Sequence, residues 1–316
     1  ELDGGRYVTS SIVVARTPDV VGFNASVHRL MLVPGVGFAI RVVPRHLYRV
    51  ITLNRKARKP TPIAIAIGVH PLVLLAASTS PAYGVFELEG FKELSGSPLC
   101  ISLTPKYAIP VPSLSSVIIE GAVTLKDVDE GPFVDLLGLY DAVRSQPLIK
   151  VEAIYVSNDD IPFHVILPGG IEHRLLMGIP REALIWRTVS EVIPRVAKVR
   201  LTDGGGGWLH AVIAIDKQSE GDGKSAIMAA FAGHPSLKHV VVVDSDIDPG
   251  NPIEVEWALA TRFQAGRGLV VVRHARGSTL DPSSFNGVTD KVGIDATAPI
   301  RDRSKYVRPR VPGKEV

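Results

Sequence analysis

The first half of the chain is a series of short strand-forming runs, and this feature limits the fold more than any other. Each run is rich in β-branched and other apolar residues, and glycine, proline or charged turns separate the runs. Strands at this spacing are typical of an antiparallel sheet or a barrel. The runs are RYVTSSIVVA (6–15), HRLMLV (28–33), GFAIRVV (37–43), TPIAIAIGV (61–69), PLCISLT (98–104), SSVIIEGAVTL (115–125) and KVEAIYVS (150–157).

From Gly178 onward, helical and strand patterns alternate. Segment 180–199 is predicted to be a helix that opens at Pro180, because proline loses no hydrogen bond at the first helical position. The alternation indicates βαβ units with a mostly parallel sheet. The fold class is therefore α+β, with domains at 1–175 and 176–316. Strands are predicted at 208–215, 239–244 and 268–273, and helices at 223–233 and 252–263.

Composition excludes several classes of protein. The 35 basic and 32 acidic residues nearly balance, so nucleic acid is not a favoured partner. The basic tail at 301–316 is expected to be solvated or to contact another subunit. Cys100 is the single cysteine, and the amino end has no signal-peptide pattern, so we expect a cytoplasmic protein. The apolar segment 62–78 is interrupted by Gly68 and Pro71 and is too short to span a membrane.

Polar residues in the first half form a candidate ligand set. Asn24 and Ser26 point the same way on an extended strand, and His46 directly follows another β run. An Asn oxygen, a His nitrogen and the carboxylate of Glu87 or Glu89 suit a hard divalent ion such as Mn or Mg, particularly one that also binds phosphate. By spacing alone, the alternative that these are ordinary turn and rim residues is the commoner case.

Two acids flank a tight bend in the run DVDEGPFVDLLGLYD (127–141). Glu130 and Asp135 stand on either side of Gly131-Pro132, and two such acids can form an acid/base pair in a pocket. The alternative is that they cap a turn.

Seven short motifs follow one another along the chain. They are N-x-S-x-x-R (24–29), P-x-H (44–46), E-G-P-F-x-[DE] (130–135), VVVVDSDIDP (240–249), WALATR (257–262), LDPS (280–283) and K-x-G-I-D-A-T (291–297). In this order they resemble the UbiD-type decarboxylases that use prenylated FMN, and the similarity runs from Gly5 to about Ala298. The resemblance implies a split β-barrel that binds the flavin, followed by an α/β domain that mediates homo-oligomer contact. It also implies that the family's amino-terminal domain is absent or precedes Glu1, where the chain begins without methionine.

The resemblance also assigns residues. Arg29, Glu130 and Asp135 match the catalytic trio, in which Glu130 supplies the proton that replaces CO₂. Asn24, His46 and Glu87 match the ligands of a divalent metal, Mn or Mg, that bridges to the flavin phosphate, and a monovalent cation such as K is implied beside it. Alignment on Gly90 places Val85 where many relatives carry the acid, so Glu87 is a substitute two residues further on, and Glu89 is the alternative glutamate. The implied cofactor-binding residues are Ser10, Asn24, Ser26, Val27, Arg29, Arg45, His46, Ser78 and Lys291.

The implied activity is the non-oxidative decarboxylation of an α,β-unsaturated acid, with a flavin prenyltransferase as the supplier of the cofactor. Segment 163–183 and a composition poor in Asn, Gln, Cys and Met, typical of thermophiles, resemble the archaeal branch. We therefore expect trans-anhydromevalonate phosphate, on the mevalonate route to isoprenoids, as the substrate, with Arg45 or His28 as extra cations for its phosphate. The alternatives are a polyprenyl-4-hydroxybenzoate or other aromatic acid decarboxylase, and an inactive flavin-binding scaffold subunit.

Overall fold

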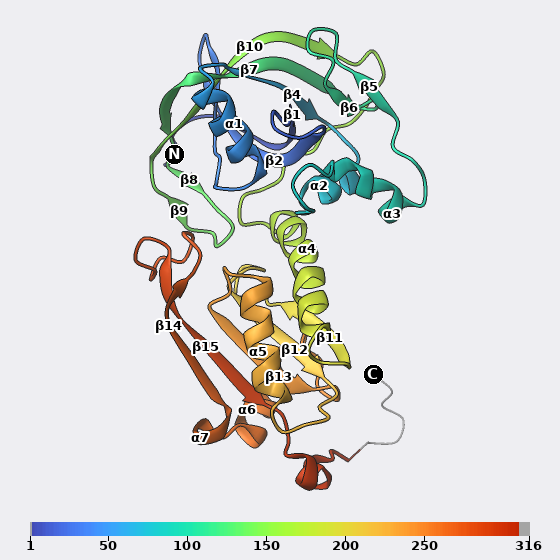
Figure 1. The fold of residues 1–316 in the computed structure, drawn as a ribbon, viewed down its shortest axis with the longest axis vertical. Helices are drawn as coiled ribbons and strands as arrows, with labels where there is room; N and C mark the ends of the chain where they lie inside the picture. Colours follow the sequence, from blue (N-terminus) through green and yellow to red (C-terminus); the bar gives the residue numbers. More distant parts are fainter. Residues whose placement is uncertain (1, 310–316) are drawn as a thin grey trace. The chain divides into compact units, whose positions relative to one another are not determined.

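The computed structural model describes residues 2–309, and the chain divides into two compact units between Leu176 and Met177 (Figure 1). The prediction for the basic tail falls partly on residues 310–316, which lie outside the described residues. Between residues 2 and 309, no helix combines the length and the apolar character needed to traverse a bilayer.

The first unit is built on a closed barrel, one of the two arrangements that the strand-rich sequence predicts. Its strand order is β1-β2-β3-β10-β7-β4, and every neighbouring pair is antiparallel. Closure leaves the barrel strands without a free edge. The strands are β1 (Tyr7–Arg16), β2 (Phe23–Val33), β3 (Gly37–Ile40), β4 (Thr61–Ile67), β7 (Val117–Glu130) and β10 (Arg144–Val156).

Two of the barrel strands, β1 and β4, are buried on both faces. On β1, Val13 and Ala15 belong to a core with residues from the other five strands, which places them inside the barrel. Ile12 and Val14 belong to a second core on the outer face, because successive side chains of a strand point to opposite sides. Helix α1 (His46–Lys56) packs on the inner core, whereas α2 (Pro71–Ala77) and the 3-10 helix η1 (Glu87–Gly90) cover the outer one.

Helix α1 is one of the elements of this unit that the sequence patterns did not predict. Its buried residues are Leu47, Val50 and Ile51. These residues lie three and four positions apart, which is the spacing of one face of a helix, so the sequence does contain a helical signal here. His46 is the first residue of α1, and its side chain therefore starts from a helix end that the barrel core holds in place.

The bend after Glu130 redirects the chain into a small hairpin of β8 (Phe133–Val134) and β9 (Tyr140–Asp141). Gly131 has φ of +99°, a conformation that favours glycine. Asp135 lies in the loop that joins the two strands. The unit is completed by α3 (Phe91–Ser95) and by a strand pair, β5 (Ile101–Leu103) and β6 (Pro110–Pro112).

The second unit contains a five-stranded sheet of order β11-β12-β13-β15-β14. The pairings β12-β13 and β13-β15 are parallel, whereas both edge strands are antiparallel to their neighbours. The sheet is therefore mixed, with the predicted parallel pairings at its centre. Its elements are β11 (Val196–Leu201), β12 (His210–Ile215), α5 (Asp222–Gly233), β13 (His239–Asp244), α6 (Pro252–Arg262), α7 (Ala265–Gly268), β14 (Leu269–Arg276), β15 (Val288–Ala296) and η2 (Ile300–Tyr306).

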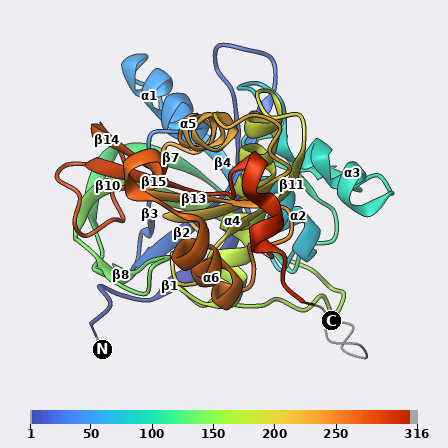
Figure 2. The same ribbon diagram turned by 90° about the horizontal axis from the view of Figure 1, so that it is seen from below.

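Helices cover both faces of this sheet. Figure 2 shows α5 and α6 on opposite sides of β13. One core joins α5 and the carboxyl half of α4 (Ile171–Ser190) to one face of the sheet, and a separate core joins α6 to the other face. This is the layering expected for βαβ units.

Helix α4 corrects the prediction for segment 180–199. The helix begins at Ile171, so Pro180 lies inside it and does not open it. Proline there removes the hydrogen bond to the carbonyl of Leu176, but most residues of 171–179 are good helix formers and carry the helix through. The predicted carboxyl end is also wrong, because 196–201 form the strand β11.

Candidate active site

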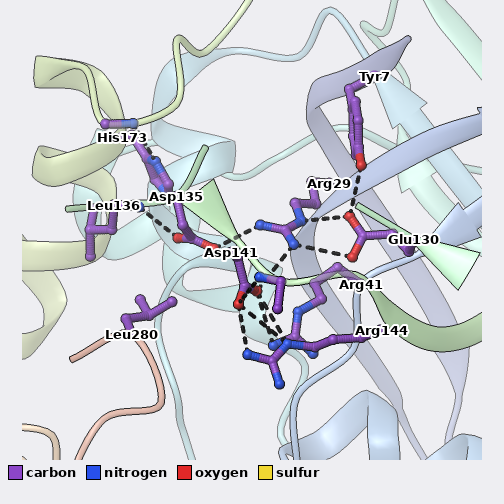
Figure 3. A network of polar contacts seen from close by, with 12 residues as sticks. Tyr7, Arg29, Arg41, Glu130, Asp135, Leu136, Asp141, Arg144, His173 and Leu280 are labelled. Carbon is purple, nitrogen blue, oxygen red and sulfur yellow. Dashed lines mark hydrogen bonds and ion pairs between the residues drawn. The ribbon is translucent and has the colours of Figure 1, made fainter. Parts of the chain in front are cut away.

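Arg29 lies on β2 at the centre of an ion-pair network (Figure 3). Its Nε and Nη2 donate to the two oxygens of Glu130 at 2.9 and 3.1 Å, so this contact is bidentate. Its Nη1 donates to Oδ2 of Asp135 at 2.8 Å. The structure therefore brings together the three residues that the family resemblance named as catalytic, although they lie on β2, at the end of β7 and in the β8–β9 loop.

Glu130 is the fully buried acid of this network. It ends β7, and its Oε1 also accepts a hydrogen bond from the Tyr7 hydroxyl at 3.1 Å. The Tyr7 ring stacks on Phe133 with centroids 3.7 Å apart. Burial, and next the charge of Glu130, raise the pKa of Tyr7, so its hydroxyl remains protonated and donates to the carboxylate.

Asp141 is a third acid at Arg29 that the sequence analysis missed. Nη2 of Arg29 donates to Oδ2 of Asp141 at 3.3 Å, and Nη2 of Arg144 donates to its Oδ1 at 2.7 Å. Nη2 of Arg41 lies 3.4 Å from Oδ2 of Asp141. Asp141 therefore joins three guanidinium groups. In the sequence, only Arg144, three residues after Asp141, could have indicated an ion pair of Asp141. The other two partners lie about a hundred residues away along the chain.

The charges of the network support one another. Burial opposes the ionised form of Asp141, but the hydrogen bond and charge of Arg144, with the charges of Arg41 and Arg29, hold its pKa below the usual value. Burial likewise opposes the charge of Arg29, but the hydrogen bond and charge of Glu130, with the charges of Asp135 and Asp141, raise its pKa. The Arg29 guanidinium is thus a permanently charged and fixed group.

A second polar cluster joins β2 to η1. The carboxylate of Glu87 accepts hydrogen bonds from Asn24 Nδ2 and from the Ala25 backbone, each at 2.7 Å. His46 Nδ1 lies 3.3 Å from Oε1 of the same carboxylate. Glu87 is buried and Glu89 is exposed, so the structure brings Glu87, and not Glu89, to Asn24 and His46.

Within residues 2–309, no group of three or more His, Cys, Asp or Glu side chains is placed to hold a metal ion. Asn24, His46 and Glu87 form a different kind of set, with one amide, one imidazole and one carboxylate.

His28 cannot serve as the extra cation that we expected for a phosphorylated substrate. Its Nε2 lies 2.8 Å from the Ser26 hydroxyl and its Nδ1 lies 2.8 Å from the carbonyl oxygen of Arg41. Burial lowers the pKa of His28 to about 4, and the Arg41 carbonyl offsets this only in part. The imidazole is therefore neutral near neutral pH.

Two further residues that the family resemblance assigned to the cofactor donate side-chain hydrogen bonds within the first unit. The Ser10 hydroxyl donates to the carbonyl of His164, and the Ser78 hydroxyl donates to that of Leu74 at 2.8 Å. Arg45 is the exposed residue immediately before α1. Val27 lies on β2 between Ser26 and His28.

Lys291 lies on β15 of the second unit. Its Nζ donates to the carbonyls of Pro235 and Leu237, each at 2.6 Å, and lies 5.2 Å from the centroid of the Phe231 ring. Burial lowers the pKa of Lys291 to about 8. Its assignment to the cofactor stays a prediction.

Comparison with known proteins identifies the family. The Rift-related domain of 3-octaprenyl-4-hydroxybenzoate carboxy-lyase (UbiD) matches residues 1–171, and the C-terminal domain of the same carboxy-lyase matches residues 174–296. The chain belongs to the UbiD family. The predicted family and the predicted carboxy-lyase class are therefore confirmed.

The curated UbiD relatives include archaeal enzymes. The anhydromevalonate phosphate decarboxylase of Aeropyrum pernix is 50% identical over 313 residues, which cover 99% of this chain and 71% of the relative. The enzyme of the same name from Methanothermobacter thermautotrophicus is 45% identical over 308 residues, which cover 97% of this chain and 72% of the relative.

Solved structures of UbiD enzymes share the fold. HmfF from Pelotomaculum thermopropionicum, in complex with FMN, aligns with a TM-score of 0.96 and 41% identity over 99% of this chain and 71% of that enzyme. An evolved dimeric form of HmfF in complex with prFMN aligns with a TM-score of 0.90 and 38% identity, over 99% of this chain and 69% of that one. The predicted fold class, a barrel followed by an α/β unit, is confirmed.

The neutral His28 makes stability depend on pH. Its folded-state pKa of about 4 lies below the unfolded value of 6.5, so the unfolded chain binds the proton more readily. The stability associated with neutral His28 is complete above the unfolded pKa and is lost as the pH falls through the folded one. Between about pH 7.5 and pH 5, titration of His28 is expected to lower the free energy of unfolding of the wild type by on the order of 2 kcal/mol. We expect His28→Gln to lack this decrease.

Urea denaturation of wild type and His28→Gln across this range measures the effect. The difference in free energy of unfolding between the two proteins is expected to change with pH. A constant difference would show that His28 does not titrate as proposed.

Proposed function

We propose that the chain is a prenylated-FMN-dependent decarboxylase that acts on trans-anhydromevalonate phosphate. The observation that carries this proposal is the bidentate contact of Arg29 with the buried Glu130, completed by Asp135. Identities of 45 to 50% to archaeal relatives named anhydromevalonate phosphate decarboxylase favour this substrate over the polyprenyl-4-hydroxybenzoate after which the family is named.

The residues around Glu87 fit a divalent metal and a flavin phosphate. Glu87 is a buried carboxylate, and His46 is the one basic side chain within ion-pair distance of it in the described part of the chain. A buried carboxylate without a strong cation is costly, and a divalent ion would compensate it. We propose that Asn24, His46 and Glu87 hold Mn or Mg there, with a monovalent cation such as K as a further partner of the flavin phosphate.

Loss of CO₂ from an unsaturated carbon requires a cofactor, because no side chain can accept the electron pair that remains. When bound, prenylated FMN would supply this electron sink. The protein orients the acid and supplies a proton. The contacts of Arg29 with Glu130, Asp135 and Asp141 use four of its five N–H donors, which leaves one donor on Nη1 for the carboxylate of the substrate.

Glu130 is the proposed proton donor. When Glu130 is protonated, its ion pair with Arg29 weakens, and the substrate carboxylate replaces the lost negative charge beside the guanidinium. The bond to the carboxyl carbon breaks and CO₂ leaves. The proton of Glu130 then forms the new C–H bond at the unsaturated carbon that carried the carboxylate, with the electron pair of the broken C–C bond. The acid and one proton thus become CO₂ and an alkene that has hydrogen in place of the carboxylate. Arg29 connects Glu130 to Asp135, whose side chain is 22% exposed, and Asp135 would return a proton from solvent.

We further propose that a flavin prenyltransferase supplies the cofactor and that copies of the chain associate through the second unit. Support for the association comes from β14, an edge strand of the sheet. Its residues Leu269, Val271 and Val272 are 44%, 50% and 37% exposed, so apolar side chains lie uncovered along a sheet edge, where another chain could cover them.

The metal proposal predicts different results for two neighbouring glutamates. Glu87→Gln removes the charge that holds the ion, so the purified protein is expected to lose most of its Mn or Mg and to bind FMN more weakly. Glu89→Gln is the matched control, because that side chain is exposed and lies two residues away. Elemental analysis and flavin absorbance measure both effects. Equal metal content in the two variants would contradict the assignment of Glu87.

Glu130→Gln tests the proton donor. Because the amide keeps the shape of the acid but has no proton to give, this variant is expected to retain flavin while turnover falls about 10²- to 10⁴-fold. Asp129→Asn, at the exposed neighbouring position, is the control and should keep wild-type turnover.

CO₂ release should be measured with protein produced together with a flavin prenyltransferase. The acids to compare are anhydromevalonate phosphate, a hydroxybenzoate and a cinnamate. Full turnover by Glu130→Gln would contradict the mechanism. Release of CO₂ only from an aromatic acid would contradict the substrate, and release from none would favour a scaffold subunit.

A further inference from the structure

Arg41 is a largely buried guanidinium that has few partners in the part of the chain that the structure describes. It directly follows β3, and its backbone N–H donates to the Arg29 carbonyl at 3.2 Å. Its side chain is 14% exposed. Within residues 2–309, the polar contacts of its guanidinium are one to Asp141 and one to the Val42 carbonyl, both 3.4 Å long. Most of its five N–H donors therefore have no close acceptor there.

Arg144 supplies a second guanidinium on the same carboxylate. Its Nε and Nη2 reach Asp141 at 3.3 and 2.7 Å, and its side chain is 36% exposed. Oδ2 of Asp141 contacts Nη2 of both Arg29 and Arg41. One small molecule can therefore contact the Arg29 and Arg41 guanidiniums together. Figure 3 shows Arg41 and Arg144 side by side at Asp141.

A purely structural role explains Arg144 better than Arg41. Asp141 is already fixed by Arg29 and by the close contacts of Arg144, and these suffice to hold the β8–β9 hairpin to the barrel. Arg41 adds one long contact to Asp141, although burying its charge is costly. Burial lowers the pKa of Arg41, and the charges of Arg144 and Arg29 act in the same direction, whereas the charge of Asp141 offsets the shift only in part. The site is thus arranged to receive a further anion.

We infer that Arg41 and Arg144, oriented by Asp141, form the subsite that binds the phosphate monoester of the substrate. This inference rests on the proposed function and specifies which residues select a phosphorylated acid. The acid's carboxylate binds at Arg29 and its phosphate at the Arg41–Arg144 pair. Guanidinium groups suit phosphate because their planar N–H donors bind its oxygens in pairs. The neutral His28 is not available for this task.

Binding to protein loaded with unmodified FMN tests the subsite apart from turnover. Calorimetry compares anhydromevalonate phosphate with the dephosphorylated acid for wild type, Arg41→Gln and Arg144→Gln. Affinity for the phosphorylated acid is expected to fall about ten- to hundredfold more than affinity for the dephosphorylated one in both variants. Arg55→Gln is the control, because Arg55 pairs with Asp127 away from this cluster, and its affinity ratio should match wild type.

Equal losses for both acids, or no loss for either, would overturn the inference. Circular dichroism and bound FMN show whether each variant is folded, and Arg41→Lys, which keeps the charge, should recover part of the phosphate selectivity. If wild type binds the phosphorylated acid through Arg41 but releases no CO₂ from it when loaded with prenylated FMN, the proposed function fails and the subsite stands. If CO₂ is released and Arg41→Gln leaves the KM for the phosphorylated acid unchanged, the subsite alone fails.

Discussion

The structure of the site depends on one guanidinium that three carboxylates hold in place. Arg29 contacts Glu130, Asp135 and Asp141, and Glu130 is fully buried. A buried charge is tolerated only when it is paired and hydrogen-bonded, and removal of one partner leaves the others uncompensated. The network therefore ties the hairpin to the barrel wall and at the same time keeps a proton-carrying group next to a fixed cation.

The barrel allows this arrangement because its interior is filled by a core and because β1 and β4 are packed on both faces. The inner core and α1 make the barrel a rigid support, and the outer core is covered by α2 and η1. Strand β2 carries Asn24 and Arg29, so one rigid element links the candidate metal cluster to the ion-pair network. Functional groups on rigid elements keep their geometry better than groups on mobile loops.

The sequence predicts those features that local spacing encodes. Short strand-forming runs separated by turns predicted the barrel strands, and the alternation of helical and strand patterns from Gly178 onward predicted the second unit. Helix α4 was placed wrongly because Pro180 is normally a helix start, whereas here helix-forming residues precede it. Sequence spacing could not place Asp141 or Arg41 beside Arg29, since these contacts join separate strands and a hairpin. The catalytic trio was named only through family resemblance, because Glu130 and Asp135 alone equally describe a turn.

The most direct test of the central claim is the decarboxylation rate of Arg29→Lys loaded with prenylated FMN. Lysine keeps the positive charge but has no planar fork, so it cannot bind Glu130 in a bidentate manner and also reach Asp135 and Asp141. We expect this variant to fold and bind flavin, and its CO₂ release from anhydromevalonate phosphate to fall about 10²-fold or more. A rate within a few-fold of wild type would contradict the claim that the guanidinium geometry organises the site.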